Sequence, residues 1–410
     1  MAKANLQIAT NGSVRVPFDQ RDGATSDVLF TRDLSPEGLR RAVAKVAPRL
    51  SGKIAIKLHT GEKDGPNIIP FNWVRELVQQ DLPDATIMET NTYYEGDRYT
   101  TEQHRETIAH NGWTFCPVDI MDEEGVATLP VAGGKWFNEM HVGTHMLNYD
   151  SMLTLTHFKG HTMGGFGGSN KNLGIGCADG RIGKGEIHTV PGSDNLWSIA
   201  EEELMERMTE STKATIDFFG DNIVYVNVMR NMSVSCDCEG TGAMPVVTPN
   251  VGILASTDIC AIDVACVDLV YAMTEAELCD NRDLVERIET RHGLRQLSYM
   301  HELGMGNWKY RLLDLDNGEA EITQAEAVAH VTPFGGQAAS KVNAFAPKYL
   351  GVGAPPPDNS VILKKALFFA GELPPGTPAT RGGQLASAGT APTATPDMPA
   401  SAPPFDKPPR

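Results

Sequence analysis

Side chains that can carry protons or charge are concentrated in one Gly-rich segment, HFKGHTMGGFGGSNKNLGIGCADGRIGKGEIH. Ten glycines fall between Gly160 and Gly185, so this backbone can approach a ligand closely and offer N–H groups to an anion. Histidine can move protons or bind a metal, and lysine can hold a carboxylate or act as a nucleophile. The candidate catalytic residues are Lys159, His161, Lys171 and His188, and Asn172 is a candidate for binding the substrate. The candidates for holding a cofactor are Gly164, Gly165, Gly167, Gly168 and Lys171.

Two common phosphate-binding patterns do not occur in this segment. The Walker A pattern G-x-x-x-x-G-K-[ST] is absent, and Gly165-Phe166-Gly167 is not followed by the third glycine of the dinucleotide fingerprint. The alternative interpretation is a flexible surface loop in which the His and Lys residues are incidental.

A second candidate site is the sequence SCDCEGTG, in which Cys236 and Cys238 are separated by one residue. A C-x-C pair is a weak metal signal, because ordinary zinc sites use C-x₂-C with a second pair. The candidate metal ligands are Cys236, Cys238 and His188, and a turn with two unrelated thiols is the alternative. The chain has seven cysteines, an odd number, so a disulfide framework is not expected, and Cys116, Cys260, Cys266 and Cys279 are predicted to be buried.

The elements that must position these residues alternate between strands and helices. Apolar strands are predicted over 53–58, 85–90, 115–120, 152–157, 222–229, 252–257 and 310–316, and helices over 36–46, 72–80, 101–110, 194–219, 262–273 and 291–306. This order predicts an α/β fold of mostly parallel sheets with helices on both faces. Ligands bind at the carboxyl ends of such strands, so the loops after Leu58 and Glu89 supply further substrate-binding candidates. These candidates are Lys57, His59, Thr60, Asn91 and Arg98.

The predicted domain organisation has four parts. Residues 1–27 read as a flexible leader, 28–192 as a first α/β block with the Gly-rich segment, and 193–316 as a second α/β block. The site is expected between the two blocks. Residues 317–410 are expected to be weakly structured to disordered, because their end is rich in Pro and Ala, and this tail could tether a partner.

Composition narrows the class of protein. The net charge is −17 and Lys and Arg form no block, which argues against nucleic-acid binding. No run of 18 apolar residues and no signal-peptide pattern occur, so no membrane association and a cytoplasmic location are expected. The expected partner is a small-molecule substrate, and a homo-oligomer is compatible with the sequence.

From about Leu29 to Asp316 the chain resembles the domain-of-unknown-function 362 family. The motifs that carry the resemblance are IKLHTGE, ETNTYYEGDR, PVDIMDEEG, HFKGHTMGGFGGSNKNLGIG, YVNVMRNMSVSCDC and GILASTDICAIDVACVDLVYA. Many members carry an inserted ferredoxin module with an iron–sulfur cluster. This chain lacks the C-x₂-C-x₂-C-x₃-C run that such a module uses.

The Gly-rich segment is also remotely similar to the active-site segment of the nickel-pincer lactate racemase family. GFGGSNKN is similar to that family's G-[FY]-S-G-G-x-K, with one extra residue, whereas an early Arg and one His of the family pattern are absent here. The resemblance implies that Lys171 holds a nickel-pincer nucleotide, His188 binds the metal and His161 is an acid or base. It further implies that Arg98 and Lys57 grip a substrate carboxylate.

These observations predict a small-molecule enzyme, of the isomerase or oxidoreductase class, acting on a polar or carboxylate metabolite. Racemase, epimerase or hydride-transfer chemistry would take place at the Gly-rich His/Lys segment. The first alternative is an iron–sulfur or other metal-binding redox protein that uses Cys236 and Cys238. The second alternative is a non-catalytic ligand-binding module.

Overall fold

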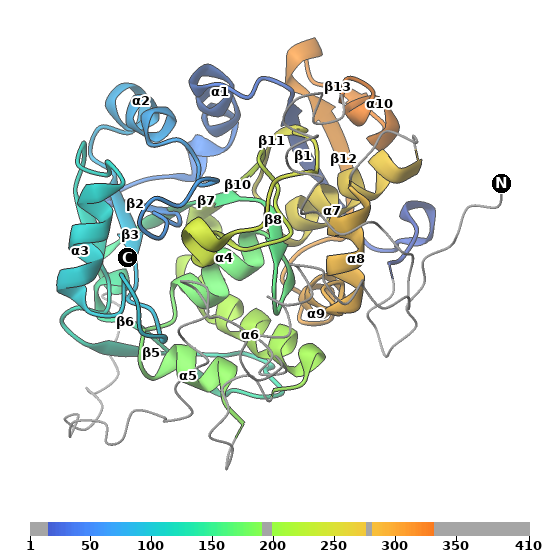
Figure 1. The fold of residues 1–410 in the computed structure, drawn as a ribbon. Coiled ribbons are helices and arrows are strands. Elements are labelled where there is room, and N and C mark those ends of the chain that lie inside the picture. Colours follow the sequence, from blue (N-terminus) through green and yellow to red (C-terminus); the bar gives the residue numbers. More distant parts are fainter. Residues whose placement is uncertain (1–14, 191–198, 276–280, 332–410) are drawn as a thin grey trace.

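The computed structural model describes residues 15–190, 199–275 and 281–331. These residues form a nine-stranded mixed sheet with helices on both faces (Figure 1), together with two separate two-stranded sheets. The order of the nine strands is β13 (Ala320–Ile322), β12 (Lys309–Asp314), β1 (Thr25–Thr31), β11 (Gly252–Ser256), β10 (Ile223–Met229), β7 (Ser151–His157), β2 (Ile54–Lys57), β3 (Thr86–Glu89) and β4 (Val118–Ile120). Five neighbouring pairs are parallel and three are antiparallel. The predicted α/β class with a mostly parallel sheet is confirmed.

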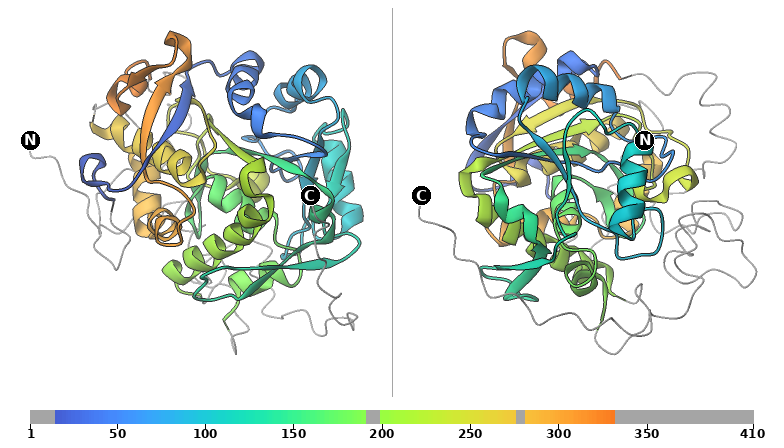
Figure 2. Two further views of the ribbon diagram at one scale, coloured as in Figure 1. Left: turned by 180° about the vertical axis from the view of Figure 1, so that it is seen from behind. Right: turned by 90° about the vertical axis from the view of Figure 1, so that its left-hand side faces the viewer.

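Alternation along the central strands sends apolar side chains to both faces. Val224, Val226 and Val228 of β10 belong to one hydrophobic cluster, whereas Ile223 and Tyr225 belong to the other. The first cluster packs under α1 (Pro36–Val46), α2 (Phe71–Asp81) and α3 (Thr101–His110). The second packs under α4 (Ser169–Gly176), α6 (Glu201–Phe219), α7 (Ile259–Glu275), α8 (Arg282–Thr290), α9 (Arg295–Glu302) and α10 (Gln324–Val328). Views from behind and from the side show the two helical layers enclosing the sheet (Figure 2).

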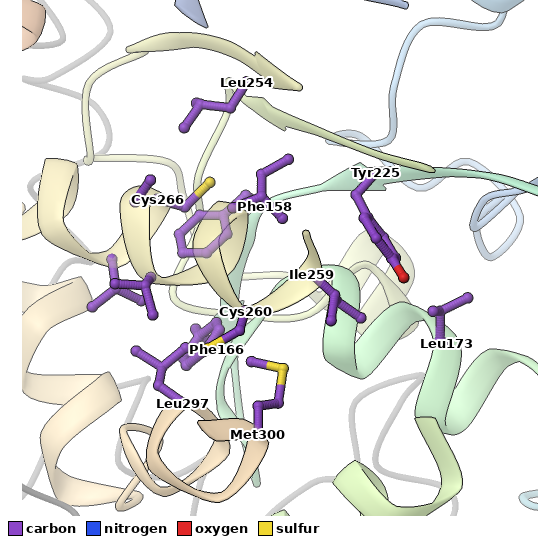
Figure 3. Close-up of a cluster of buried hydrophobic side chains, with 14 of the residues drawn as sticks. Phe158, Phe166, Leu173, Tyr225, Leu254, Ile259, Cys260, Cys266, Leu297 and Met300 are labelled. Atoms are coloured by element: carbon purple, nitrogen blue, oxygen red, sulfur yellow. The ribbon is translucent and has the colours of Figure 1, made fainter. Parts of the chain in front are cut away.

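Local sequence accounts for several element boundaries. Ser35 Oγ accepts the N–H of Gly38 and Pro36 occupies the first turn, as expected for the start of α1. Asp258 Oδ1 accepts the N–H of Ala261 at the start of α7, so this side chain caps the helix. Helix α7 is apolar on most sides because it lies between the sheet and the helices α8 to α10. Figure 3 shows its Ile259, Cys260 and Cys266 among side chains of the second cluster.

The Gly-rich segment differs from the loop that its composition suggests. It folds into the hairpin of β8 (Lys159–His161) and β9 (Gly165–Gly167), followed by α4 and by α5 (Gly183–His188). A Cβ on Gly160 would lie 2.5 Å from the Val234 backbone, and a Cβ on Gly174 would lie 2.3 Å from the Met208 carbonyl oxygen. The glycines therefore serve close packing of the chain against itself. A second hairpin, β5 (Val126–Pro130) and β6 (Glu139–Gly143), was not predicted.

The ends of the predicted parts are only partly described. Within the predicted leader, Thr25 to Asp27 belong to β1 and the buried Arg21 pairs with Asp268 at 2.6 Å, while residues 1–14 lie outside the described residues. Strand β12 of the second predicted block pairs with β1, so the strands of both blocks join one sheet. Of the predicted tail, 317–331 includes β13 and α10, and 332–410 lies outside the described residues. No helix in the described part of the chain has both the length and the apolar character needed to span a membrane.

Candidate functional site

A cavity of about 150 Å³ opens at the edge of the sheet where parallel strands end. Lys57 ends β2, Glu89 ends β3 and His157 ends β7, so adjacent parallel strands deliver these side chains to one place. A volume of this size has room for on the order of ten water molecules. The charged and imidazole side chains that line it are Lys57, His59, Glu89, Arg98, His157, Lys159, His161, Lys171, Lys184, His188 and Glu239.

Lys57 and Arg98, which the resemblance assigns to a substrate carboxylate, are both committed to carboxylates of the protein. Lys57 Nζ lies 3.2 Å from Glu89 Oε2, and both side chains are almost completely buried. Burial opposes the charge of Glu89, but the ammonium of Lys57 and the neighbouring cations hold the pKa of this carboxyl well below its usual range. Arg98 donates to Glu62 Oε1 through Nε at 3.0 Å and Nη2 at 2.8 Å. These pairs leave Lys57 and Arg98 less available for a substrate carboxylate than the resemblance implies.

Two other lysines lack such a partner. Within the described residues, no carboxylate oxygen lies at ion-pair distance from Lys171 or Lys184. Lys184 Nζ donates to Thr90 Oγ1 at 2.7 Å and to the Asn91 carbonyl, and burial lowers its pKa to about 8. An anionic ligand in the cavity would offset this cost of burial.

Four histidines line the cavity, and in His59, His161 and His188 the neighbouring backbone or carboxylate groups indicate which ring nitrogen carries the proton. His161 Nδ1 accepts the N–H of Gly164 at 2.7 Å, so the proton of the neutral ring is on Nε2. His188 Nδ1 lies 2.7 Å from the Lys184 carbonyl oxygen, so its Nδ1 donates and Nε2 keeps a lone pair. Burial lowers the pKa of His161, and it lowers the pKa of His188 to about 4, so both rings are neutral near pH 7.

The third ring, His59, is held by Glu89. His59 Nδ1 lies 3.5 Å from Glu89 Oε1, and this carboxylate neighbour favours the neutral tautomer with the proton on Nδ1 and the lone pair on Nε2. This Nε2 is buried and has no hydrogen-bond partner among the described residues. Burial and then the charge of Arg98 lower the pKa of His59, which keeps the ring neutral.

Cys238 lines the cavity, and Cys236, which is 1% exposed, is buried beside it in the loop that follows β10; these two residues are called here the Cys pair. Their sulfurs and a ring nitrogen of His161 all lie within 4.8 Å of one another. Lys171 Nζ lies 3.7 Å from Cys236 Sγ. The structure thus joins two candidate sites that are about 65 residues apart in the sequence.

The N-terminus of α4, which carries Lys171 and Asn172, is occupied by the chain itself. Asp263 of α7 accepts the N–H groups of Ser169 at 2.8 Å and Asn170 at 2.9 Å. These N–H groups were candidates for binding an anion, and an internal carboxylate takes that place. Asp263 therefore positions Lys171 by anchoring its helix.

Most of the predicted site residues gather at the cavity. The lining includes Lys57, His59, Arg98, Lys159, His161, Gly164, Gly168, Lys171, Asn172, His188 and Cys238. Thr60 and Asn91 stand behind it, where Thr60 donates to Glu89 and Asn91 bonds Thr101 and Lys184. Gly165 and Gly167 are buried in β9 and Cys236 is 1% exposed.

Sequence reasoning missed Glu89 and Asp237 as partners of the cavity cations. Asp237 accepts from His157 Nδ1 at 2.8 Å and Lys159 Nζ at 2.9 Å. The sequence does show that Glu89 is an acidic residue at the end of an apolar strand and that Asp237 is an acidic residue between two cysteines. Neither position reveals by itself which lysine the carboxylate meets.

The chain was compared with solved structures, with curated protein sequences and with models of protein families. The lactate racemase apoprotein from Thermoanaerobacterium thermosaccharolyticum is 10% identical, with a TM-score of 0.35 over 73% of this chain and 85% of that chain. A protein from Thermotoga maritima is 12% identical, with a TM-score of 0.30 over 48% of this chain and 51% of that chain. No curated protein sequence matches the chain. The model of the domain of unknown function DUF362 matches residues 54–268, more than half of the chain, and the chain therefore belongs to the DUF362 family.

Proposed function

We propose that this protein is a small-molecule enzyme of the isomerase or oxidoreductase class, acting on a small anionic metabolite that carries a hydroxyl group. The observation that carries the proposal is the set of three neutral imidazoles with different fixed tautomers around one cavity. His161 offers an N–H, whereas His59 and His188 each offer a lone pair on Nε2. Groups that give and accept protons in one enclosed site are what acid–base catalysis requires.

His59 is the proposed acceptor of the substrate proton. Its buried Nε2 lacks a partner, and a substrate hydroxyl would satisfy it. The Glu89 carboxylate behind Nδ1 holds the ring in position and stabilises the imidazolium that forms on proton transfer. His161 Nε2–H would donate to the oxygen or carbonyl on the other side of the reaction, and the cation Lys184 would attract the anionic group.

The residues fit the metal-containing cofactor that the lactate racemase resemblance implies. His188 is neutral, and its Nδ1 donates to a backbone carbonyl, which is the usual arrangement around a metal-binding imidazole. Lys171 lines the same cavity and would hold the organic part of the group. When bound, such a group supplies a hydride acceptor, so that the substrate carbon need not become a carbanion.

The proposal is tested with protein purified anaerobically from its native host and a panel of single-enantiomer 2-hydroxy acids. Inversion is followed by chiral chromatography. His59→Gln and His161→Gln are each expected to lower the rate about 10²- to 10⁴-fold, the usual contribution of an acid or base. His110→Gln is the matched control, because the His110 side chain is 46% exposed and pairs with the surface residue Asp64. Full rates in both cavity variants would contradict the assigned roles.

A second measurement reads the tautomers without any substrate. Nitrogen-15 NMR of the imidazoles is expected to show Nε2–H for His161 and Nδ1–H for His59 and His188. The opposite tautomer at His161 would remove the basis of the proposal. Bound iron and sulfide in the purified protein would support the redox alternative instead.

A further inference from the structure

The loop that carries the Cys pair is anchored on both sides of its second cysteine. The Asp237 carboxylate accepts from Lys159 Nζ at 2.9 Å, and the Glu239 carboxylate accepts from Thr162 Oγ1 at 2.7 Å. Both acids are buried. Because Cys238 lies between these two anchors, the fold itself sets where the sulfurs of the Cys pair stand.

The two sulfurs are close enough for one metal ion to bind both of them. They lie within 4.8 Å of each other. A metal–thiolate bond of about 2.3 Å lets a single ion span two sulfurs about 4.6 Å apart. Cys238 lines the cavity, and Cys236 Sγ lies 3.7 Å from Nζ of Lys171, another lining residue. Both sulfurs are therefore on the cavity side of the loop.

The nitrogen donor nearest to the Cys pair, His161, offers no free lone pair. One of its ring nitrogens lies within 4.8 Å of both sulfurs. Its Nδ1 accepts the Gly164 N–H at 2.7 Å, however, and Nε2 carries the proton of the neutral ring. The group therefore supplies two sulfur ligands. Zinc takes three or four ligands from a protein, whereas Cu(I) is soft and forms linear complexes with two thiolates.

The charge of Lys171 favours the same ion. Two thiolates and one Cu(I) carry a single negative charge, and a buried charge needs a partner of opposite sign. Within the described residues no carboxylate oxygen lies at ion-pair distance from Lys171, whose ammonium stands beside Cys236. A divalent ion on the same two thiolates would be neutral and would leave this ammonium without a counter-charge.

We propose that the Cys pair binds one Cu(I) ion through the sulfurs of Cys236 and Cys238. Binding replaces the remaining thiol protons by the metal and transfers no electrons. The ion reaches the Cys pair from the cavity, where Cys238 is partly exposed. Cys236 is 1% exposed, as suits a ligand that holds an ion away from water.

The test titrates the full chain, reduced and desalted without oxygen, with Cu(I) in the presence of the coloured chelator bathocuproine disulfonate. The wild type is expected to withdraw one equivalent of copper from the chelator. Cys236→Ser and Cys238→Ser are each expected to lower the affinity more than about 100-fold, the upper loss for a supporting contact. Lys171→Met should lower it about 10- to 100-fold at unchanged stoichiometry.

Two further variants separate the ligands from their neighbours. His161→Gln is expected to keep its equivalent of copper, because the ring is not a ligand. Cys116→Ser is the matched control, since Cys116 is partly exposed and belongs to no group of three possible ligands in the described part of the chain. X-ray absorption at the copper edge is expected to show two sulfur neighbours. Circular dichroism shows that each variant is folded.

Three outcomes would overturn the proposal. These are a wild type that withdraws no copper, a folded Cys236→Ser or Cys238→Ser variant that binds as the wild type does, and Zn(II) bound more tightly than Cu(I) with its affinity lost in His161→Gln. The proposal stands apart from the proposed function, because the titration needs no substrate turnover. Loss of inversion in His59→Gln should therefore leave copper binding unchanged.

Discussion

Replacing Glu89 by glutamine removes one charge from the buried pair that organises the cavity. The glutamine can still accept from the Thr60 N–H and hydroxyl, which lie 2.8 Å and 3.0 Å from Glu89 Oε1. It cannot balance Lys57 Nζ, 3.2 Å away, or Arg98 Nη1, 3.8 Å away. The substitution therefore isolates the charge, with the shape and the hydrogen-bond acceptor retained.

The expected cost follows from burial. The side chains of Lys57 and Glu89 are 1% and 3% exposed, and breaking such a pair from one side destabilises a protein by about 3–5 kcal/mol. Since glutamine retains part of the hydrogen bonding, we expect a loss of about 3 kcal/mol in the free energy of unfolding. The matched control is Glu319→Gln, because Glu319 pairs with Lys45 while both are more than 40% exposed. Such a surface pair contributes about 0–1 kcal/mol.

Chemical denaturation at pH 7, followed by circular dichroism, measures both variants. The double variant Lys57→Met/Glu89→Gln is expected to recover part of the stability lost in Glu89→Gln, because it no longer buries an unpaired ammonium. A Glu89→Gln variant as stable as Glu319→Gln would refute the reasoning. So would a double variant whose losses simply add, because additivity would mean that the two charges do not interact.

Two further predictions concern the imidazole and glycine positions. Burial lowers the pKa of His188 from 6.5 to about 4, so the unfolded chain binds the extra proton first and wild-type stability falls as the pH drops through this window. In the metal-free protein, His188→Asn should lack this part of the loss in the free energy of unfolding, which is about 2 kcal/mol at pH 4.5. Chemical denaturation of both proteins at pH 7 and at pH 4.5 measures the difference. Identical pH profiles for the wild type and the variant would contradict the assignment. Gly160→Ala would place a Cβ 2.5 Å from the Val234 Cα, so we expect the free energy of unfolding to fall by about 1–3 kcal/mol. Thermal unfolding measures this change, and an unchanged melting temperature would exclude the close approach.

Much of the fold follows from local sequence patterns. The apolar segments that form β2, β3, β7, β10 and β11 are short and bounded by polar loops, and segments with helical periodicity lie between several of them. This alternation indicates a parallel sheet whose two faces are covered by helices. Helix α3 spans the predicted Thr101–His110 because its capping residues are local to it. In contrast, the β8–β9 hairpin could not be predicted, because its glycines are required by backbone segments distant in sequence, such as residue 234.

For the candidate site too, the sequence predicted some features and not others. Residue types and their positions after strands were sufficient to nominate Lys57, His59, His161, Lys171 and His188, because the carboxyl ends of parallel strands share one edge. The sequence could not show which charges would pair, since ion pairs depend on side chains from different strands meeting at particular distances.

Only the tertiary structure decided the chemistry of the individual groups. The Gly164 amide, the Lys184 carbonyl and the Glu89 carboxylate select the tautomers of three histidines that look alike in the sequence, Nε2–H in His161 and Nδ1–H in His188 and His59. Likewise, the packing of α4 against the loop after β10 brings Lys171 to Cys236. Protonation and reactivity depend on distance and burial, and these exist only after the chain has folded.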